Sequence, residues 1–211
     1  MPDYSGTVVV PTLWDTKEQT IISTESADIL KIFSKEFNQF CATQQQADLD
    51  LFPIEYEEKI KEAIEWLSPN ITSGVYKVLR AKTQQDYDKT VEEFFGHLQR
   101  AEDILSKQRY IAGDVFTGAD VMLFCTLIRF DAVYHGMFRL YKKRIVDYEN
   151  LWGYVREIYQ MQGVSDTVDF HHIRMGYMAN GMGEVNKDCI IWAMPEMDLH
   201  SAHGRDKKFE N

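Results

Sequence analysis

Residues 109–134 combine a helix start with a nearly continuous apolar run, a segment that few folds can accommodate. Thr117 and Asp120 have the spacing of a capping box, in which the acidic side chain accepts a hydrogen bond from the backbone N–H of the cap. Nearly every residue from 121 to 133 is apolar, and a helix without a wide polar face lies inside a helical domain. We therefore predict a central core helix starting at Thr117, and we interpret both polar residues as structural.

Hydrophobic periodicity predicts a mainly α-helical chain that begins with a short β-rich segment. Residues 7–14 are rich in β-branched side chains, and residues 20–22 repeat this character after a polar turn, which predicts two strands. Pro11 cannot donate to a sheet, so we expect it at an end or on an exposed side of the first strand. A helix is expected to open at Ser26, and helical spacing recurs in residues 56–67, 87–105, 148–159 and 166–178.

The charge balance and the N-terminal sequence restrict the partners and the compartment. The formal net charge is −10, with 23 basic and 33 acidic residues, so the overall field repels phosphate backbones and anionic membranes. The first residues lack a basic region followed by an apolar run, and the sequence contains no run of about 18 apolar residues. We expect a cytoplasmic protein without a nucleic-acid or membrane partner.

The sequence suggests no metal site. Cys41, Cys125 and Cys189 are widely spaced and form no Cys-x-x-Cys pair. His171 and His172 are adjacent, so on a helix they point to different sides, and no cluster of cysteines or carboxylates completes a zinc site.

The chain resembles the glutathionyl-hydroquinone reductases, the xi class of the glutathione transferases. The Thr-x-x-Asp pattern inside a buried helix resembles the folding signature of the helical domain of these enzymes. A longer ordered series of motifs carries the specific resemblance, at residues 128–135 (IRFDAVYH), 147–148 (DY), 150–154 (NLWGY), 158–160 (IYQ) and 167–170 (TVDF).

This resemblance implies a fold and a domain organisation. The fold is mainly α, a glutathione transferase C-terminal helical domain preceded by a partial thioredoxin-like piece of two strands and a helix. Residues 1–41 would be part of the glutathione-binding domain, 42–52 a linker, 53–181 the all-α domain and 182–211 an extended tail.

The resemblance also implies a glutathione site near the N-terminus. Val10 would pair through its backbone with the cysteinyl unit, and Pro11 would be the cis-proline of a thioredoxin-like domain. Glu25 would take the γ-glutamyl ammonium and Ser26 the carboxylate, because free amides and the dipole at a helix start favour an anion. Simple helix capping explains Ser26 equally well.

For the second substrate, the resemblance implies a pocket in which tyrosines donate to the oxygens of an aromatic quinol. Tyr76 and Tyr177 match such positions, and Tyr177 is the stronger candidate. The chain departs from the pattern at Ser68, where the family usually has a tyrosine. The alternative is that Tyr76 and Tyr177 are packing residues, since tyrosine occurs 11 times.

The family's nucleophile is the cysteine of a Cys-Pro-Trp-Ala motif, and the sequence contains no such motif. We expect the first strand, first helix and second strand of the thioredoxin-like domain to be absent and this chain to be inactive. Cys125 is expected to be buried in the apolar helix, Cys41 to follow a helix and Cys189 to lie in the tail, so none of them is placed as a nucleophile.

Two functions remain open. The first is a glutathione-dependent reductase of glutathionyl-hydroquinones that acts by thiol exchange, with glutathione as co-substrate, aromatic quinol conjugates as substrates and a homodimer formed through the helical domain. The second is a non-catalytic helical module for binding or dimerisation.

Overall fold

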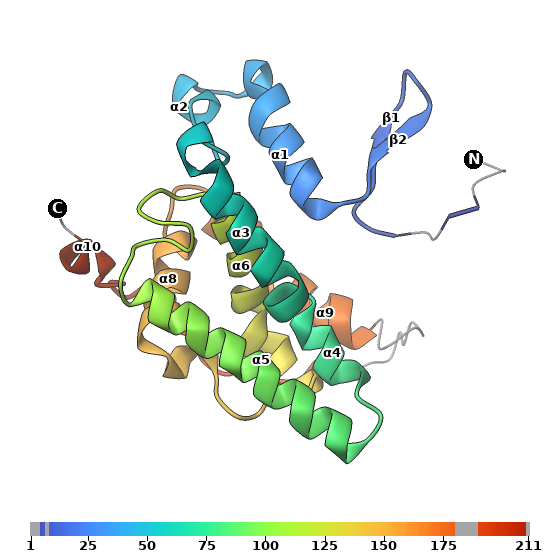
Figure 1. The fold of residues 1–211 in the computed structure, drawn as a ribbon, viewed down its shortest axis with the longest axis vertical. Coiled ribbons are helices and arrows are strands. Elements are labelled where there is room, and N and C mark those ends of the chain that lie inside the picture. Colours follow the sequence, from blue (N-terminus) through green and yellow to red (C-terminus); the bar gives the residue numbers. More distant parts are fainter. Residues whose placement is uncertain (1–4, 7–8, 180–189, 210–211) are drawn as a thin grey trace. The chain divides into compact units, whose positions relative to one another are not determined.

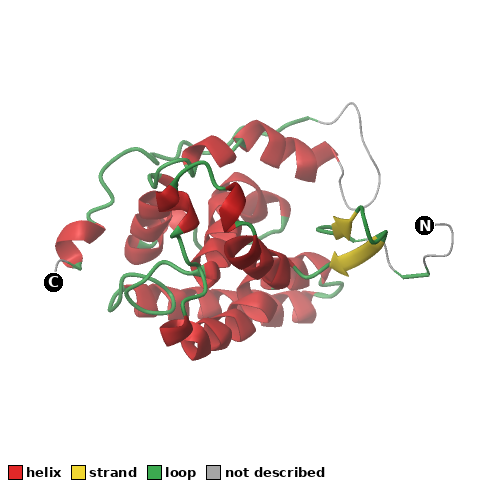
Figure 2. Ribbon diagram, turned by 90° about the horizontal axis from the view of Figure 1, so that it is seen from above, coloured by secondary structure: helices red, strands yellow, loops and turns green. Residues whose placement is uncertain are grey.

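The computed structural model describes residues 5–6, 9–179 and 190–209 (Figure 1). The chain divides into two compact units, Met1–Glu57 and Glu58–Asn211. Most of the described chain is helical, and the described strands lie in the first unit (Figure 2). The prediction of a mainly α fold with a β-β-α piece is confirmed.

In the first unit, two short strands lead into a helix. β1 (Leu13–Asp15) pairs antiparallel with β2 (Thr20–Ser23), and Leu13 lies opposite Ser23. The helix α1 (Ser26–Glu36) follows with Glu25 as its N-cap. After it come a 3-10 turn (Asn38–Phe40), the short helix α2 (Gln44–Ala47) within the expected linker, and a 3-10 turn (Ile54–Tyr56).

The first strand starts later than the sequence predicted. Residues 7–14 were expected to form it, but Val9 and Val10 are not in a strand, and Thr7 and Val8 lie outside the described residues. The strand begins two residues after Pro11, because proline has no N–H to give to a sheet. The Val10–Pro11 peptide bond is cis, as expected.

The helical unit consists of helices joined by short turns, and its first helix, α3, begins at the unit boundary. The helices are α3 (Glu57–Leu67), α4 (Gly74–Arg80), α5 (Gln84–Leu105), α6 (Gly118–Arg129), α7 (His135–Met137), α8 (Glu149–Tyr159), α9 (Phe170–Ala179) and α10 (Arg205–Lys208). π turns occupy Ser68–Thr72 and Phe130–Tyr134, and 3-10 turns occupy Ile145–Asp147 and Ser165–Thr167. None of the helices in the described ranges has both the length and the apolar character that a membrane crossing requires.

The helix α6 is the core helix that the sequence predicted. Eight of its 12 residues are buried, and it packs against α8 and against the π turn after α3 (Figure 1). The capping box is present, since the carboxylate of Asp120 accepts from the backbone N–H of Thr117 over 2.8 Å. The same carboxylate accepts from the Thr117 hydroxyl over 2.8 Å.

One face of α6 is open, which corrects the expectation for Cys125. This side chain is exposed, although the surrounding sequence is strongly apolar. Met122, Cys125 and Arg129 follow one another at helical spacing on the same face and are less buried than Leu123 and Leu127. A count of apolar residues cannot reveal this face.

The C-terminal segment is anchored by a buried ion pair. Residues 190–204 have no regular secondary structure, but α10 follows them, and the Arg205 side chain is buried against α8. Its Nε atom donates to Glu157 over 2.7 Å, and Glu157 also accepts from Arg109 Nε over 2.6 Å and from the Tyr110 hydroxyl over 3.0 Å.

Candidate functional site

Three tyrosine hydroxyls meet in the helical unit. The Tyr177 hydroxyl lies 2.7 Å from that of Tyr134 and 3.0 Å from that of Tyr76. The three side chains come from α9, the π turn after α6, and α4, respectively. The structure therefore brings together the two tyrosines chosen from the sequence and adds Tyr134.

A local irregularity of the backbone positions Tyr134. The helix α6 continues directly into the π turn Phe130–Tyr134, a widened turn of the kind that often occurs at functional sites. The Asp131 carboxylate fixes this turn by accepting from the backbone N–H groups of Ile145 over 2.7 Å and Val146 over 3.0 Å. Burial raises the pKa of Asp131, and these two donors oppose that effect.

Phe138 supports all three tyrosine rings. Its ring centre lies 4.9 Å from that of Tyr134, 5.3 Å from that of Tyr76 and 5.9 Å from that of Tyr177. Phe138 is almost completely buried. Because aromatic rings at these separations attract one another, the three hydroxyls are held by packing as well as by their mutual hydrogen bonds.

The hydroxyls of Tyr134 and Tyr177 stay protonated over the physiological range. Burial raises the pKa of Tyr177 to about 12 and raises that of Tyr134 further, since its hydroxyl is more deeply buried and hydrogen-bonded to Tyr177. Three hydroxyls carry three protons, and the two bonds among them use two. One proton is thus free to be donated to an acceptor outside the cluster, such as an oxygen of a ligand.

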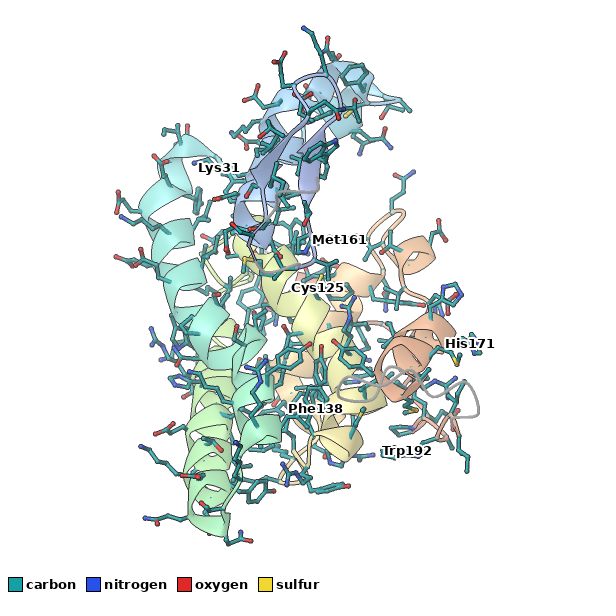
Figure 3. The ribbon with its side chains drawn as sticks, turned by 90° about the vertical axis from the view of Figure 1, so that its right-hand side faces the viewer. Lys31, Cys125, Phe138, Met161, His171 and Trp192 are labelled. Atoms are coloured by element: carbon teal, nitrogen blue, oxygen red, sulfur yellow. The ribbon has the colours of Figure 1, made fainter. Side chains whose placement is uncertain are left out.

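A hollow of about 590 Å³ lies between α6 and α9, with Tyr177 in its lining. Cys125, Ile128 and Arg129 line the α6 side, and Ile173 lies on the α9 side. Figure 3 shows the two helices side by side, with Cys125 on α6 and with His171 on α9 pointing away from it. Apolar and polar side chains share this lining, and a concave site with convergent polar groups is a candidate for small-molecule binding.

The residues expected to bind glutathione lie in the first unit. Pro11 precedes β1 and Glu25 follows β2, so the pairing of Leu13 with Ser23 places both at the same end of the hairpin. Val10, Glu25 and Ser26 are all exposed. The Glu25 side chain makes no capping bond to α1, and its backbone N–H donates to the Ser23 hydroxyl over 3.0 Å.

Neither described cysteine occupies the N-terminus of a helix, and Cys189 lies outside the described residues. Cys41 is exposed after the 3-10 turn Asn38–Phe40, and Cys125 is the eighth residue of α6. The described residues contain no group of three or more histidines, cysteines and carboxylates that could hold a metal ion.

Comparison with known proteins identifies the family. Residues 84–157 match the model of the glutathione S-transferase C-terminal domain. Over 99% of its length the chain is 43% identical to the glutathionyl-hydroquinone reductase YqjG of Escherichia coli, and it covers 62% of that protein. It is 34% identical to the glutathionyl-hydroquinone reductase PcpF of Sphingobium chlorophenolicum, with 94% of the chain and 62% of that protein aligned. The chain belongs to the glutathione transferase family.

Among solved structures, this glutathione transferase chain is similar to members of the xi class. The glutathione-bound structure of YqjG from Escherichia coli matches it with a TM-score of 0.88 and 42% identity, covering 99% of the chain and 66% of that structure. The xi-class enzyme of Natrialba magadii matches with a TM-score of 0.85 and 40% identity, covering 95% of the chain and 60% of that structure. The chain thus spans slightly less than two thirds of these relatives, and the resemblance to glutathionyl-hydroquinone reductases is confirmed.

The sequence did not single out Tyr134 as a site residue. It lies within the motif at residues 128–135, which served only to identify the family. Its contact with Tyr177, 43 positions later, is long-range, and the π turn that directs it has no recognisable sequence pattern.

Proposed function

We propose that the protein to which this chain belongs is an enzyme that reduces glutathionyl-hydroquinones with glutathione, and that the helical unit binds the aromatic ring. The observation that carries the proposal is the tyrosine cluster, in which the Tyr177 hydroxyl lies within hydrogen-bond distance of those of Tyr76 and Tyr134 and Tyr177 lines an open hollow. A quinol offers two oxygens, and a neutral tyrosine is a suitable donor to either of them. The names of YqjG and PcpF support the same substrate class.

The proposed reaction is thiol exchange in two steps. A cysteine thiolate attacks the glutathionyl sulfur, so that a sulfur–sulfur bond forms, the carbon–sulfur bond breaks and the ring carbon takes up a proton. A second glutathione thiolate then attacks this mixed disulfide and releases glutathione disulfide and the cysteine. We assign the nucleophile to the Cys-Pro-Trp-Ala motif of the family, which these 211 residues do not contain.

In this proposal the chain's own residues bind and orient the substrates. Val10 pairs through its backbone with the cysteinyl part of glutathione and Pro11 faces the thiol site, while Glu25 takes the γ-glutamyl ammonium and Ser26 the carboxylate. Tyr177 donates the one free proton of the cluster to the quinol oxygen, with Tyr76 as the alternative donor, and Tyr134 holds Tyr177 in place. A homodimer formed through the helical unit and a cytoplasmic location complete the proposal, both by resemblance to the family.

The test is Tyr177→Phe in the full-length protein, measured as the rate of quinol release and as the dissociation constant for glutathione. We expect the rate to fall at least tenfold while glutathione binding changes less than twofold, because Tyr177 would contact the ring and not the tripeptide.

Tyr159→Phe on α8 is the control, since its hydroxyl makes no hydrogen bond within the described part of the chain. Equal loss of rate and of glutathione binding would make Tyr177 a structural residue. Full-length protein that binds quinol conjugates without turning them over would favour the non-catalytic module.

A further inference from the structure

The hollow between α6 and α9 contains a cation without a counter-ion. Arg129, the last residue of α6, lines it together with Cys125 and Tyr177. Within the described ranges, no carboxylate lies at ion-pair distance from the Arg129 guanidinium. Arg109, Arg144 and Arg205 of the same unit, by contrast, each pair with Asp or Glu at 2.6–2.8 Å.

The Arg129 side chain is folded back along its own helix. One terminal nitrogen donates to the backbone carbonyl of Cys125 over 2.5 Å, which holds the guanidinium beside the exposed face of α6. A guanidinium has five N–H donors in a planar fork, so this bond leaves most of them available. Two parallel N–H groups fit the two oxygens of a carboxylate.

The other charged groups of the hollow do not neutralise Arg129. Asp169 accepts the backbone N–H of His172 over 2.9 Å at the start of α9, and it lies 3.6 Å from the imidazole of the same residue. This carboxylate is therefore already paired with the helix start, and His172 is largely exposed. Asp169 thus remains a negative charge engaged at the start of α9, and Arg129 is the arginine of the hollow that a ligand carboxylate can pair with.

This charge acts on the tyrosine cluster. Burial is the largest influence on the pKa values of Tyr134 and Tyr177 and raises both, while the positive charge of Arg129 lowers both by a smaller amount. Arg129 and Tyr177 line the same hollow, so a single small molecule in it can contact both the guanidinium and the hydroxyl cluster.

We infer that the hollow selects aromatic quinols that carry a carboxylate, with Arg129 pairing the carboxylate and the tyrosine cluster binding a quinol oxygen. The inference rests on the proposed function for the quinol itself and adds the anionic substituent as the determinant of specificity. A carboxylate could also come from glutathione, so the source has to be distinguished by experiment.

The experiment measures ligand binding by this chain and therefore does not depend on turnover. The probes are a naphthohydroquinone with a carboxylate next to one hydroxyl, the matching neutral carboxamide, and glutathione, each titrated anaerobically and followed by calorimetry. We expect the carboxylate to bind at least tenfold more tightly than the carboxamide, a difference of about 1.4 kcal/mol. Arg129→Met should abolish this preference and leave the carboxamide affinity within about twofold, whereas Arg129→Lys should retain part of it.

Each outcome separates this inference from the proposed function. If neither quinol binds, the proposed function fails as well. If both quinols bind equally to the wild-type chain, or if Arg129→Met keeps the preference, the inference fails and the proposed function stands. If Arg129→Met weakens glutathione binding and leaves the quinol preference intact, the carboxylate that Arg129 recognises belongs to glutathione, and the inference is again overturned.

Should Arg129→Met not fold, the wild-type chain is titrated at raised ionic strength. Loss of its preference for the carboxylate over the carboxamide supports the inference, and an unchanged preference contradicts it.

Discussion

The hydroxyl of Tyr154 donates to the carboxylate of Asp120 over 2.9 Å, at a point where neither side chain reaches solvent. Asp120 also accepts from the backbone N–H groups of Ile111 and Thr117 and from the Thr117 hydroxyl, each over 2.8 Å. One carboxylate therefore joins the loop before α6, the first turn of α6 and the middle of α8. Asp120 does more than cap a helix.

We predict that Asp120→Ala destabilises the helical unit far more than Thr117→Ala. Removal of the carboxylate leaves four donors without their acceptor in a buried site, which should cost about 3 kcal/mol or more, whereas removal of one hydroxyl at a cap costs about 1 kcal/mol. The measurement is urea unfolding followed by circular dichroism. Tyr154→Phe is the control, since it removes one of the four donors and should cost about 1 kcal/mol. Similar losses for Asp120→Ala and Thr117→Ala would show that Asp120 acts as a cap alone.

The pair of Arg205 and Glu157 leads to a second prediction. Arg205→Met leaves the Glu157 carboxylate buried with fewer partners, so we expect a loss of about 3–5 kcal/mol in the free energy of unfolding. Arg109 also contacts Glu157 but is more exposed, and Arg109→Met should cost less. Urea unfolding of both variants checks this order. Lys207→Met, an exposed change in α10, is the control and should be nearly neutral. A loss below about 1 kcal/mol for Arg205→Met would mean that the C-terminal helix contributes little to the fold.

The sequence predicted those parts of the fold that are encoded locally. The helical spacing of apolar Phe94, Leu98 and Leu105 predicts α5, and the capping-box spacing of Thr117 and Asp120 predicts the start of α6. Both patterns extend over only a few residues and can therefore be recognised in the sequence. The exposed face of α6 at Cys125 depends instead on what packs against each side of the helix. A uniformly apolar sequence does not contain that information.

The candidate site was predictable in part for the same reason. Tyr76 and Tyr177 could be matched to family positions, but their contact spans 101 positions, and the third member, Tyr134, reaches Tyr177 from a π turn. The pairing of Arg205 with Glu157 is equally remote along the chain. Neither a hydrophobic period nor a short sequence motif specifies contacts between residues so far apart along the chain.

Buried tyrosines should make the fold sensitive to alkaline pH. Burial raises the pKa of Tyr177, Tyr110 and Tyr148 to about 12 each, from about 10 in an unfolded chain. Between these values the folded chain holds protons that the unfolded chain has lost, so the stability due to these groups is complete below pH 10 and is lost as the pH rises toward 12. Urea unfolding at a series of pH values should show this decline. Tyr177→Phe should make the decline shallower, and an identical slope would indicate that Tyr177 titrates normally.

We predict that the 211-residue chain binds quinol conjugates but does not turn them over. Cys125 lines the hollow together with Tyr177, but it is the eighth residue of α6 and not at a helix N-terminus, where nucleophilic cysteines are found. The measurement is quinol release by the pure chain, with Cys125→Ser and Cys41→Ser as paired variants. Turnover that disappears with either variant would contradict the prediction and assign the nucleophile to that cysteine.

Two glycines on neighbouring helices should respond to alanine in opposite directions. A Cβ at Gly74, at the start of α4, would lie 3.0 Å from the Phe94 ring, which is buried and stacked on Phe130, so Gly74→Ala should cost about 1–3 kcal/mol. A Cβ at Gly96 in α5 would meet no atom within 4 Å, and Gly96→Ala should stabilise the chain by about 0.5–1 kcal/mol through helix propensity.

Because Tyr76 follows Gly74 by two residues on α4, Gly74→Ala should also weaken quinol binding, while Gly96→Ala should leave it unchanged. Stability from urea unfolding and affinity from calorimetry check both effects, and a Gly74→Ala variant that loses stability but binds the quinol normally would remove Tyr76 from the site.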